Sequence, residues 1–125
     1  MVDASAALSG LLNAGPARSL MSSEQLHAPH LLDTEVSNAL RRHVAARKMD
    51  ASIGWVVLDA LRQLGMTRYP TFPFLDRIWQ LRDNLSAYDA SYVALAELLG
   101  CSLVTGDGRL SQSPGIRCPV TVVPR

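Results

Sequence analysis

The sequence has little cysteine, little net charge and no long apolar run. Only Cys101 and Cys118 occur among 125 residues, so two thiols in a reducing compartment are expected rather than a disulfide framework. The longest uncharged segment, residues 4–17, contains Gly15 and Pro16 and is shorter than the ~20 residues of a membrane span. No basic flank precedes an apolar run at the N-terminus, which argues against a signal peptide. These absences predict a cytoplasmic protein that does not enter a membrane.

Charge and hydrophobicity further limit the class of protein to which the chain can belong. Twelve basic residues nearly balance eleven acidic ones, which excludes a protein held to nucleic acid by overall charge but not a local basic patch. The three histidines lack the spacing of metal ligands. A chain of this length that is 48% hydrophobic can bury its own core, so we expect a single domain over residues 1–125.

Strand-like and helical patterns alternate along the chain, which predicts an α/β fold with a parallel sheet covered on both faces. Helices are expected to end at Gly65 and Gly100, and residues 66–73 are expected to be irregular or a short edge strand. Trp55 and Trp79 fall on apolar helix faces, where packing in the core or a dimer is favoured over base stacking. The expected strands are 1–2, 25–28, 102–105 and 120–123, and the expected helices are 5–13, 31–48, 52–64, 74–82 and 87–99.

Four carboxylates lie where strands pass into helices or where a helix begins: Asp3, Glu35, Asp89 and Asp107. Such passages meet at one edge of a parallel sheet, so these side chains are expected there together. Each also has an ordinary explanation, as a helix cap or a favourable charge near a helix start. A group of four would repel strongly, and protons or a cation must neutralise it. Oxygen ligands without nearby His or Cys favour Mg²⁺ or Mn²⁺.

The residues around these acids resemble PIN-domain toxins of the VapC type, in order and along essentially the whole chain. The third of the four matching strings is the most specific. The strings are Val2-Asp3-Ala4-Ser5, Leu32-Asp33-Thr34-Glu35-Val36-Ser37-Asn38-Ala39-Leu40-Arg41, Leu81 to Glu97 (LRDNLSAYDASYVALAE) and Leu103-Val104-Thr105-Gly106-Asp107-Gly108-Arg109-Leu110. Only two residues precede Asp3, whereas the first strand is commonly longer in the family, so either the strand is short here or the start is trimmed.

The resemblance implies a PIN-like three-layer α/β/α sandwich around a central parallel sheet. It also implies a Mg²⁺- or Mn²⁺-dependent endoribonuclease that forms a homodimer and is inhibited by a VapB-type antitoxin. Leucines of an early helical pair could offer that partner a groove, although core packing explains them equally well. The catalytic residues carried over are Asp3, Glu35, Asp89 and Asp107, with Ser5 and Thr105 as auxiliary hydroxyls.

Within that site, Asp3, Asp89 and Asp107 are expected to be metal ligands. Glu35 is expected to orient or deprotonate the attacking water. Neutralising Asp3 or Asp89 with asparagine is expected to abolish cleavage and to leave thermal stability unchanged or higher. The arginines expected to contact RNA phosphates are Arg41, Arg42, Arg82 and Arg109, and a solvated helix end is an equal explanation for the first two.

Two other classes of protein, a metal-dependent phosphatase and a non-catalytic binding module, match these residues less well. A Mg²⁺-dependent phosphatase that uses an aspartate after the first strand also needs an aspartate two residues later, where this chain has Ser5, and a lysine in the later chain, whereas Lys48 is the only lysine. A non-catalytic PIN-like module would bind RNA or a partner without cutting, but it would not need all four carboxylates.

Overall fold

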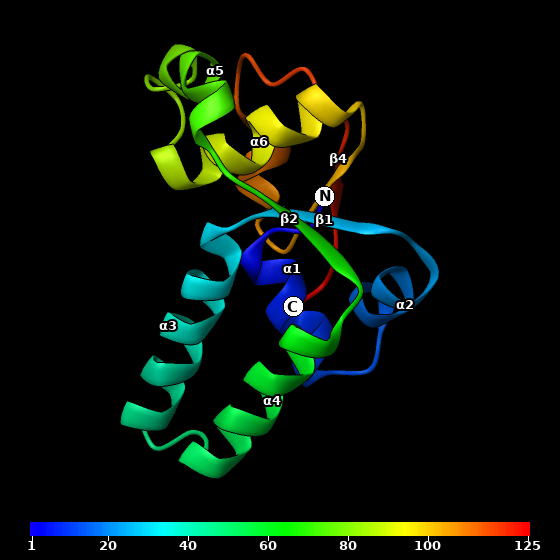
Figure 1. The fold of residues 1–125 in the computed structure, drawn as a ribbon, viewed down its shortest axis with the longest axis vertical. Helices are drawn as coiled ribbons and strands as arrows, with labels where there is room; N and C mark the ends of the chain where they lie inside the picture. The colour runs from blue at the N-terminus through cyan, green and yellow to red at the C-terminus, as the bar shows by residue number, and fades with distance from the viewer.

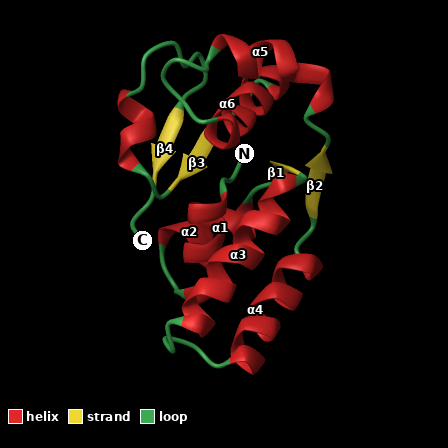
Figure 2. Cartoon of the chain, turned by 90° about the vertical axis from the view of Figure 1, so that its left-hand side faces the viewer, coloured by secondary structure: helices red, strands yellow, loops and turns green.

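Four short parallel strands and the N-terminal segment form the middle layer of the computed structural model, which describes residues 1–125. Strand β1 (Leu26–Pro29) pairs with β2 (Met66–Tyr69), and β3 (Leu103–Thr105) pairs with β4 (Val120–Val122). The N-terminal segment lies between the two pairs. Val2 N donates to His27 O at 3.2 Å, and Val2 forms a parallel bridge with Val104. Backbone contacts therefore run across the whole layer in the order β2, β1, Val2, β3, β4 (Figure 2).

Helices cover both faces of this layer, so the expected three-layer α/β/α sandwich is confirmed. Helices α1 to α4 lie on one side of the strands and α5 and α6 on the other (Figures 1 and 2). None of the helices is long and apolar enough to cross a membrane. The helices are α1 (Ala4–Leu12), α2 (Pro16–Ser23), α3 (Leu31–Ala45), α4 (Ala51–Gln63), α5 (Leu75–Gln80) and α6 (Ala87–Leu99), with 3₁₀ turns η1 (Phe72–Phe74) and η2 (Gly108–Gln112).

Helix α6 is the most deeply buried helix, and local sequence explains both of its ends. Ser86 caps the first turn, because its Oγ accepts from Asp89 N at 3.1 Å. Gly100 ends the helix in the left-handed conformation, with φ of 65°, as expected from the sequence. Every residue from Ala90 to Ala96 is buried, so the start of α6 is held firmly over the sheet edge.

A half-buried ion pair joins α5 to α6. Arg77 Nε lies 2.6 Å from Glu97 Oε1, and the two side chains are 16% and 13% exposed. Burial alone would raise the pKa of Glu97, but the hydrogen bonds from Arg77 and from the Arg117 backbone outweigh it and hold the pKa below its ordinary value. This pair therefore fixes the outer helical layer behind the sheet.

Three local expectations can be followed in the structure. Residues 66–69 form the short edge strand that was one of the two expected alternatives, and pairing with β1 holds it in register. Helix α4 ends before Gly65 as expected, although that glycine has no positive φ, since the cap residue Leu64 is extended. Trp55 and Trp79 are 56% and 68% exposed, so neither belongs to the core of this chain, and packing in a dimer stays a prediction.

Candidate active site

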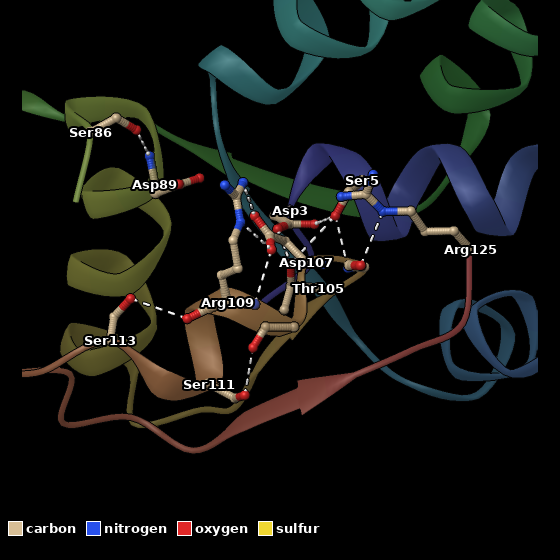
Figure 3. A network of polar contacts seen from close by, with 12 residues as sticks. Asp3, Ser5, Ser86, Asp89, Thr105, Asp107, Arg109, Ser111, Ser113 and Arg125 are labelled. Atoms are coloured by element: carbon tan, nitrogen blue, oxygen red, sulfur yellow. Dashed lines mark hydrogen bonds and ion pairs between the residues drawn. The ribbon is translucent and has the colours of Figure 1, made fainter. Parts of the chain in front are cut away.

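Asp3 is the buried anchor of the carboxylate edge, with 5% of its surface exposed. It directly follows the bridging segment and caps helix α1. Its Oδ1 accepts from Ser5 Oγ at 2.7 Å and from Ala6 N at 2.9 Å. Its Oδ2 accepts from Thr105 Oγ1 (Figure 3). A carboxylate offers about four lone-pair positions, so one remains for a further ligand.

The two hydroxyls beside Asp3 also hold the turn after β3. Ser5 Oγ accepts from Gly106 N at 2.8 Å, and Thr105 Oγ1 accepts from Asp107 N at 3.0 Å. A side chain at Gly106 would place its Cβ 3.2 Å from Ser5 Oγ, so this close approach favours glycine. These contacts set the backbone of Asp107 against the start of α1.

Asp107 is paired with an arginine of the same turn. Arg109 Nη2 lies 2.9 Å from Asp107 Oδ2, and Arg109 Nε donates to Oδ1 at 3.1 Å. Asp107 also caps η2 by accepting from Arg109 N. The Arg109 guanidinium therefore holds the pKa of Asp107 below its ordinary range. The arginine side chain is 90% exposed and that of Asp107 only 19%, so the arginine side of the pair lies open to solvent.

Glu35 lies on α3 and receives a hydrogen bond from the buried Tyr92 of α6, whose hydroxyl is 2.6 Å from Glu35 Oε1. Burial raises the pKa of Glu35, and the charges of Asp89 and Asp3 raise it further, while the hydrogen bond from Tyr92 lowers it. The net pKa is above the ordinary value. Glu35 thus has neighbouring negative charge and no cationic partner.

Asp89 reaches toward the same edge from the first turn of α6 (Figure 3). Burial raises its pKa most, followed by the charges of Asp3 and Asp107, and Arg109 lowers it only in part. Asp89 thus lies within the electrostatic reach of Asp3 and Asp107, and Glu35 within that of Asp3 and Asp89. The capping explanations for Asp3 and Asp107 also hold, because both side chains cap the helices that follow them.

The donor chemistry of this edge fits a hard divalent cation. Two of its carboxylates have pKa values raised by burial and by neighbouring negative charge, and none of the four lies beside a His or Cys ligand set. No three His, Cys, Asp or Glu side chains are already placed as a metal-binding group. A cation at this edge would therefore need side-chain adjustments, to which the exposed Arg109–Asp107 pair offers little resistance.

The structure separates the four arginines expected to contact RNA. Arg109 is at the carboxylate edge, and Arg42 lines a groove that also contains Glu35. Arg41 instead donates to Asn38 at 3.0 Å and lines a different hollow, between α3 and α4. Arg82 lies over the Trp79 ring at 4.8 Å. Only Arg42 and Arg109 are thus found beside the candidate catalytic residues.

Tyr92 is a site residue that sequence reasoning missed. It follows Asp89 by three residues on α6, and residues at that spacing share a helix face. This spacing could have indicated that Tyr92 lies near the carboxylates. In an apolar helix, however, a tyrosine is normally interpreted as a core residue. Its pKa is raised by burial and by the Glu35 carboxylate, so its hydroxyl remains a hydrogen-bond donor.

We expect Tyr92→Phe to reduce cleavage roughly tenfold at pH 6 and less at pH 8. Removing the hydroxyl removes the interaction that lowers the pKa of Glu35, so the acid limb of the rate profile should move to higher pH. The rate constant measured across this pH range is the readout. Tyr88→Phe, on the exposed side of the same helix, is the matched control. A pH-independent loss in Tyr92→Phe would contradict this role.

Comparisons with known proteins identify the family of the chain. Residues 1–115 match the PIN domain family. The chain is 54% identical over 125 residues to "VapC ribonuclease Mb0985" of Mycobacterium bovis, covering 100% of this chain and 98% of that protein. It is 42% identical to "Ribonuclease VapC1" of Mycobacterium tuberculosis, covering 98% and 96% of the two chains.

A solved structure agrees with the sequence relatives on the fold. PAE2754 from Pyrobaculum aerophilum, a crystal structure, superposes with a TM-score of 0.69 and 25% sequence identity. The match covers 95% of this chain and 80% of that one. The resemblance noted in the sequence is thus supported independently by full-length similarity and by architecture.

Proposed function

Since the chain belongs to the PIN-domain family, within its VapC group, we propose that it is a metal-dependent endoribonuclease that hydrolyses RNA phosphodiester bonds. The observation that carries the proposal is the convergence of Asp3, Glu35, Asp89 and Asp107 on one sheet edge, where burial, and after it the neighbouring carboxylate charges, raise the pKa of Glu35 and of Asp89. Relatives whose names include ribonuclease match the whole chain.

Asp3, Asp89 and Asp107 would hold Mg²⁺ or Mn²⁺, the cations that carboxylate oxygens favour. Such an ion would polarise the phosphate and lower the pKa of a bound water. Ser5 and Thr105 would keep Asp3 in one orientation, because each hydroxyl donates to a different carboxylate oxygen.

Glu35 would accept the proton of the attacking water. Its raised pKa suits this role, since a base works best when its pKa lies nearer to the working pH. Tyr92 fixes one carboxylate oxygen and leaves the other free to face the water. Arg109 would hold a phosphate if it left Asp107, because its side chain is 90% exposed.

We further propose that the enzyme acts in the cytoplasm as the toxin of a toxin–antitoxin pair, and that a VapB-type antitoxin inhibits it. A homodimer would cover a group of exposed apolar side chains around α5. Such side chains cost free energy in water and mark association surfaces. The group consists of Phe72, Leu75, Trp79 and Tyr88, which are 74%, 56%, 68% and 64% exposed.

Metal removal tests the proposed chemistry directly. We expect purified protein to cleave single-stranded RNA with Mg²⁺ or Mn²⁺, to lose this activity in EDTA and to regain it when the metal is restored. Gel analysis of end-labelled RNA is the measurement. A non-catalytic module would bind RNA without cutting it under any of these conditions, and cleavage that persists in EDTA would refute metal dependence.

A further inference from the structure

A groove runs from the candidate active site along the interface of α1 and α3. Its volume is about 460 Å³. Glu35 and Ser5 line one part of it, so the groove is continuous with the carboxylate edge. Apolar side chains of α1, including Leu8 and Leu12, form part of its wall, and Ser9 and Asn13 add polar groups. The remaining lining residues include two arginines and a histidine: Arg42, Arg125 and His43.

Helical spacing sets Arg42 and His43 in line with Glu35. They follow it by seven and eight residues on α3, which places all three on one helix face. At 1.5 Å of rise per residue, Arg42 lies about 10 Å along the helix axis from Glu35. A strand of nucleic acid with one phosphate at the carboxylates can thus present a neighbouring phosphate to Arg42.

The arginine side chains in the groove are available to bind a ligand. The Arg42 side chain is exposed and forms none of the chain's four ion pairs. Arg125 approaches from the β4 side, where its Nε donates to Gly106 O at 3.0 Å (Figure 3). That single bond leaves its terminal nitrogens available. Arg41, next to Arg42 in sequence, faces the hollow between α3 and α4 instead.

We propose that this groove binds the phosphodiester backbone of single-stranded RNA beside the scissile bond, through Arg42, His43 and Arg125. The inference rests on the proposed function, because it assigns the groove to the substrate of that site. Arg42 has no acidic partner in the chain, and the phosphates of a nucleic acid would supply one. Glu35 belongs both to the groove and to the carboxylate edge, so a strand bound in the groove would reach the candidate catalytic residues. Arg41 is not part of this binding site.

The test compares two adjacent arginines in a cleavage-silent background. Asp89→Asn protein is titrated with a short fluorescein-labelled single-stranded RNA of mixed sequence, and anisotropy is followed over a range of KCl concentrations. Adding Arg42→Ala should weaken affinity about fivefold and reduce the slope of log affinity against log salt by about 0.7. Adding Arg41→Ala should leave both unchanged. His43→Gln should weaken affinity in the same direction as Arg42→Ala.

Two results would overturn the proposal. If Arg42→Ala and Arg41→Ala weaken binding equally, RNA is attracted by the general positive charge at the end of α3 and not bound by the groove. If neither Arg42→Ala nor His43→Gln changes RNA affinity, the groove and its leucine wall belong to a protein partner. Cleavage assays on the chain without Asp89→Asn decide the proposed function separately, since RNA can bind in the groove whether or not it is cut.

Discussion

Asp89→Asn should abolish RNA cleavage, with a loss of at least about a hundredfold, and should leave the chain as stable as before or more stable at pH 7. The substitution removes a proposed metal ligand while keeping the size of the side chain. It also removes a charge that the folded state disfavours, because burial and the charges of Asp3 and Asp107 raise the pKa of Asp89. Cleavage rate and the urea midpoint of unfolding measure the two effects.

The direction of the pH effect follows from the raised pKa. The ionised Asp89 side chain destabilises the folded state at a pH above its folded pKa, and this penalty disappears as pH falls below the ordinary value of 3.8. The stability gain of Asp89→Asn should therefore be present at pH 7 and absent in strong acid. Any cost from losing a charge in the first helical turn acts in the opposite direction.

Asp76→Asn is the matched control for Asp89→Asn. Asp76 is exposed and also lies in the first turn of a helix, α5, so its replacement loses the same favourable interaction with the helix start. We expect full cleavage activity and no gain in stability from this variant. If Asp89→Asn cleaved RNA at the parent rate, the catalytic assignment of the carboxylate edge would be wrong.

Asp3→Asn should abolish cleavage as well, but it should lower stability by about 1–2 kcal/mol. Asp3 is buried, and its two carboxylate oxygens accept three hydrogen bonds, from Ser5, Ala6 and Thr105. An asparagine has one acceptor oxygen, so at least one of these donors loses its partner or must reorient. Cleavage assays and urea unfolding of the same preparation measure both effects.

Asp50→Asn separates helix capping from the special environment of Asp3. Asp50 precedes α4 as its N-cap but makes no side-chain capping bond. Its replacement should change neither cleavage nor the urea midpoint appreciably. A fully stable Asp3→Asn variant would show that the hydrogen bonds at Asp3 add nothing to the fold, and an active one would remove Asp3 from the metal site.

Sequence reasoning treats Asp3 and Asp89 alike, and the structure separates them. From charge repulsion alone, either substitution is expected to leave stability unchanged or higher. The structure gives Asp3 three hydrogen-bond donors, whereas at Asp89 burial and neighbouring negative charge outweigh the favourable contacts and raise the pKa. Partners such as Thr105, one hundred and two residues away in sequence, cannot be found from local pattern.

The same distinction explains which fold predictions succeeded. Helix α6 was predicted with its observed bounds because its cap, its apolar run and its final glycine are all local signals. Residues 66–69 were predicted only as irregular or a short edge strand, because the hydrogen bonds that fix them as β2 come from β1, forty residues earlier in the sequence. Trp79 was expected to pack in the core or in a dimer. Helical periodicity alone cannot choose between these, and the structure shows that Trp79 is not in the core.

The sequence by itself determined the α/β alternation, the family and the four acids at strand and helix ends, because each is written in spacing and residue type. Only the tertiary structure decided that Tyr92 bonds to Glu35, that Thr105 bonds to Asp3, and that Arg42 rather than Arg41 faces the groove. The physical reason is that these contacts depend on how helices rotate and pack across the sheet. That packing is settled by burial over the whole chain and not by any short stretch of it.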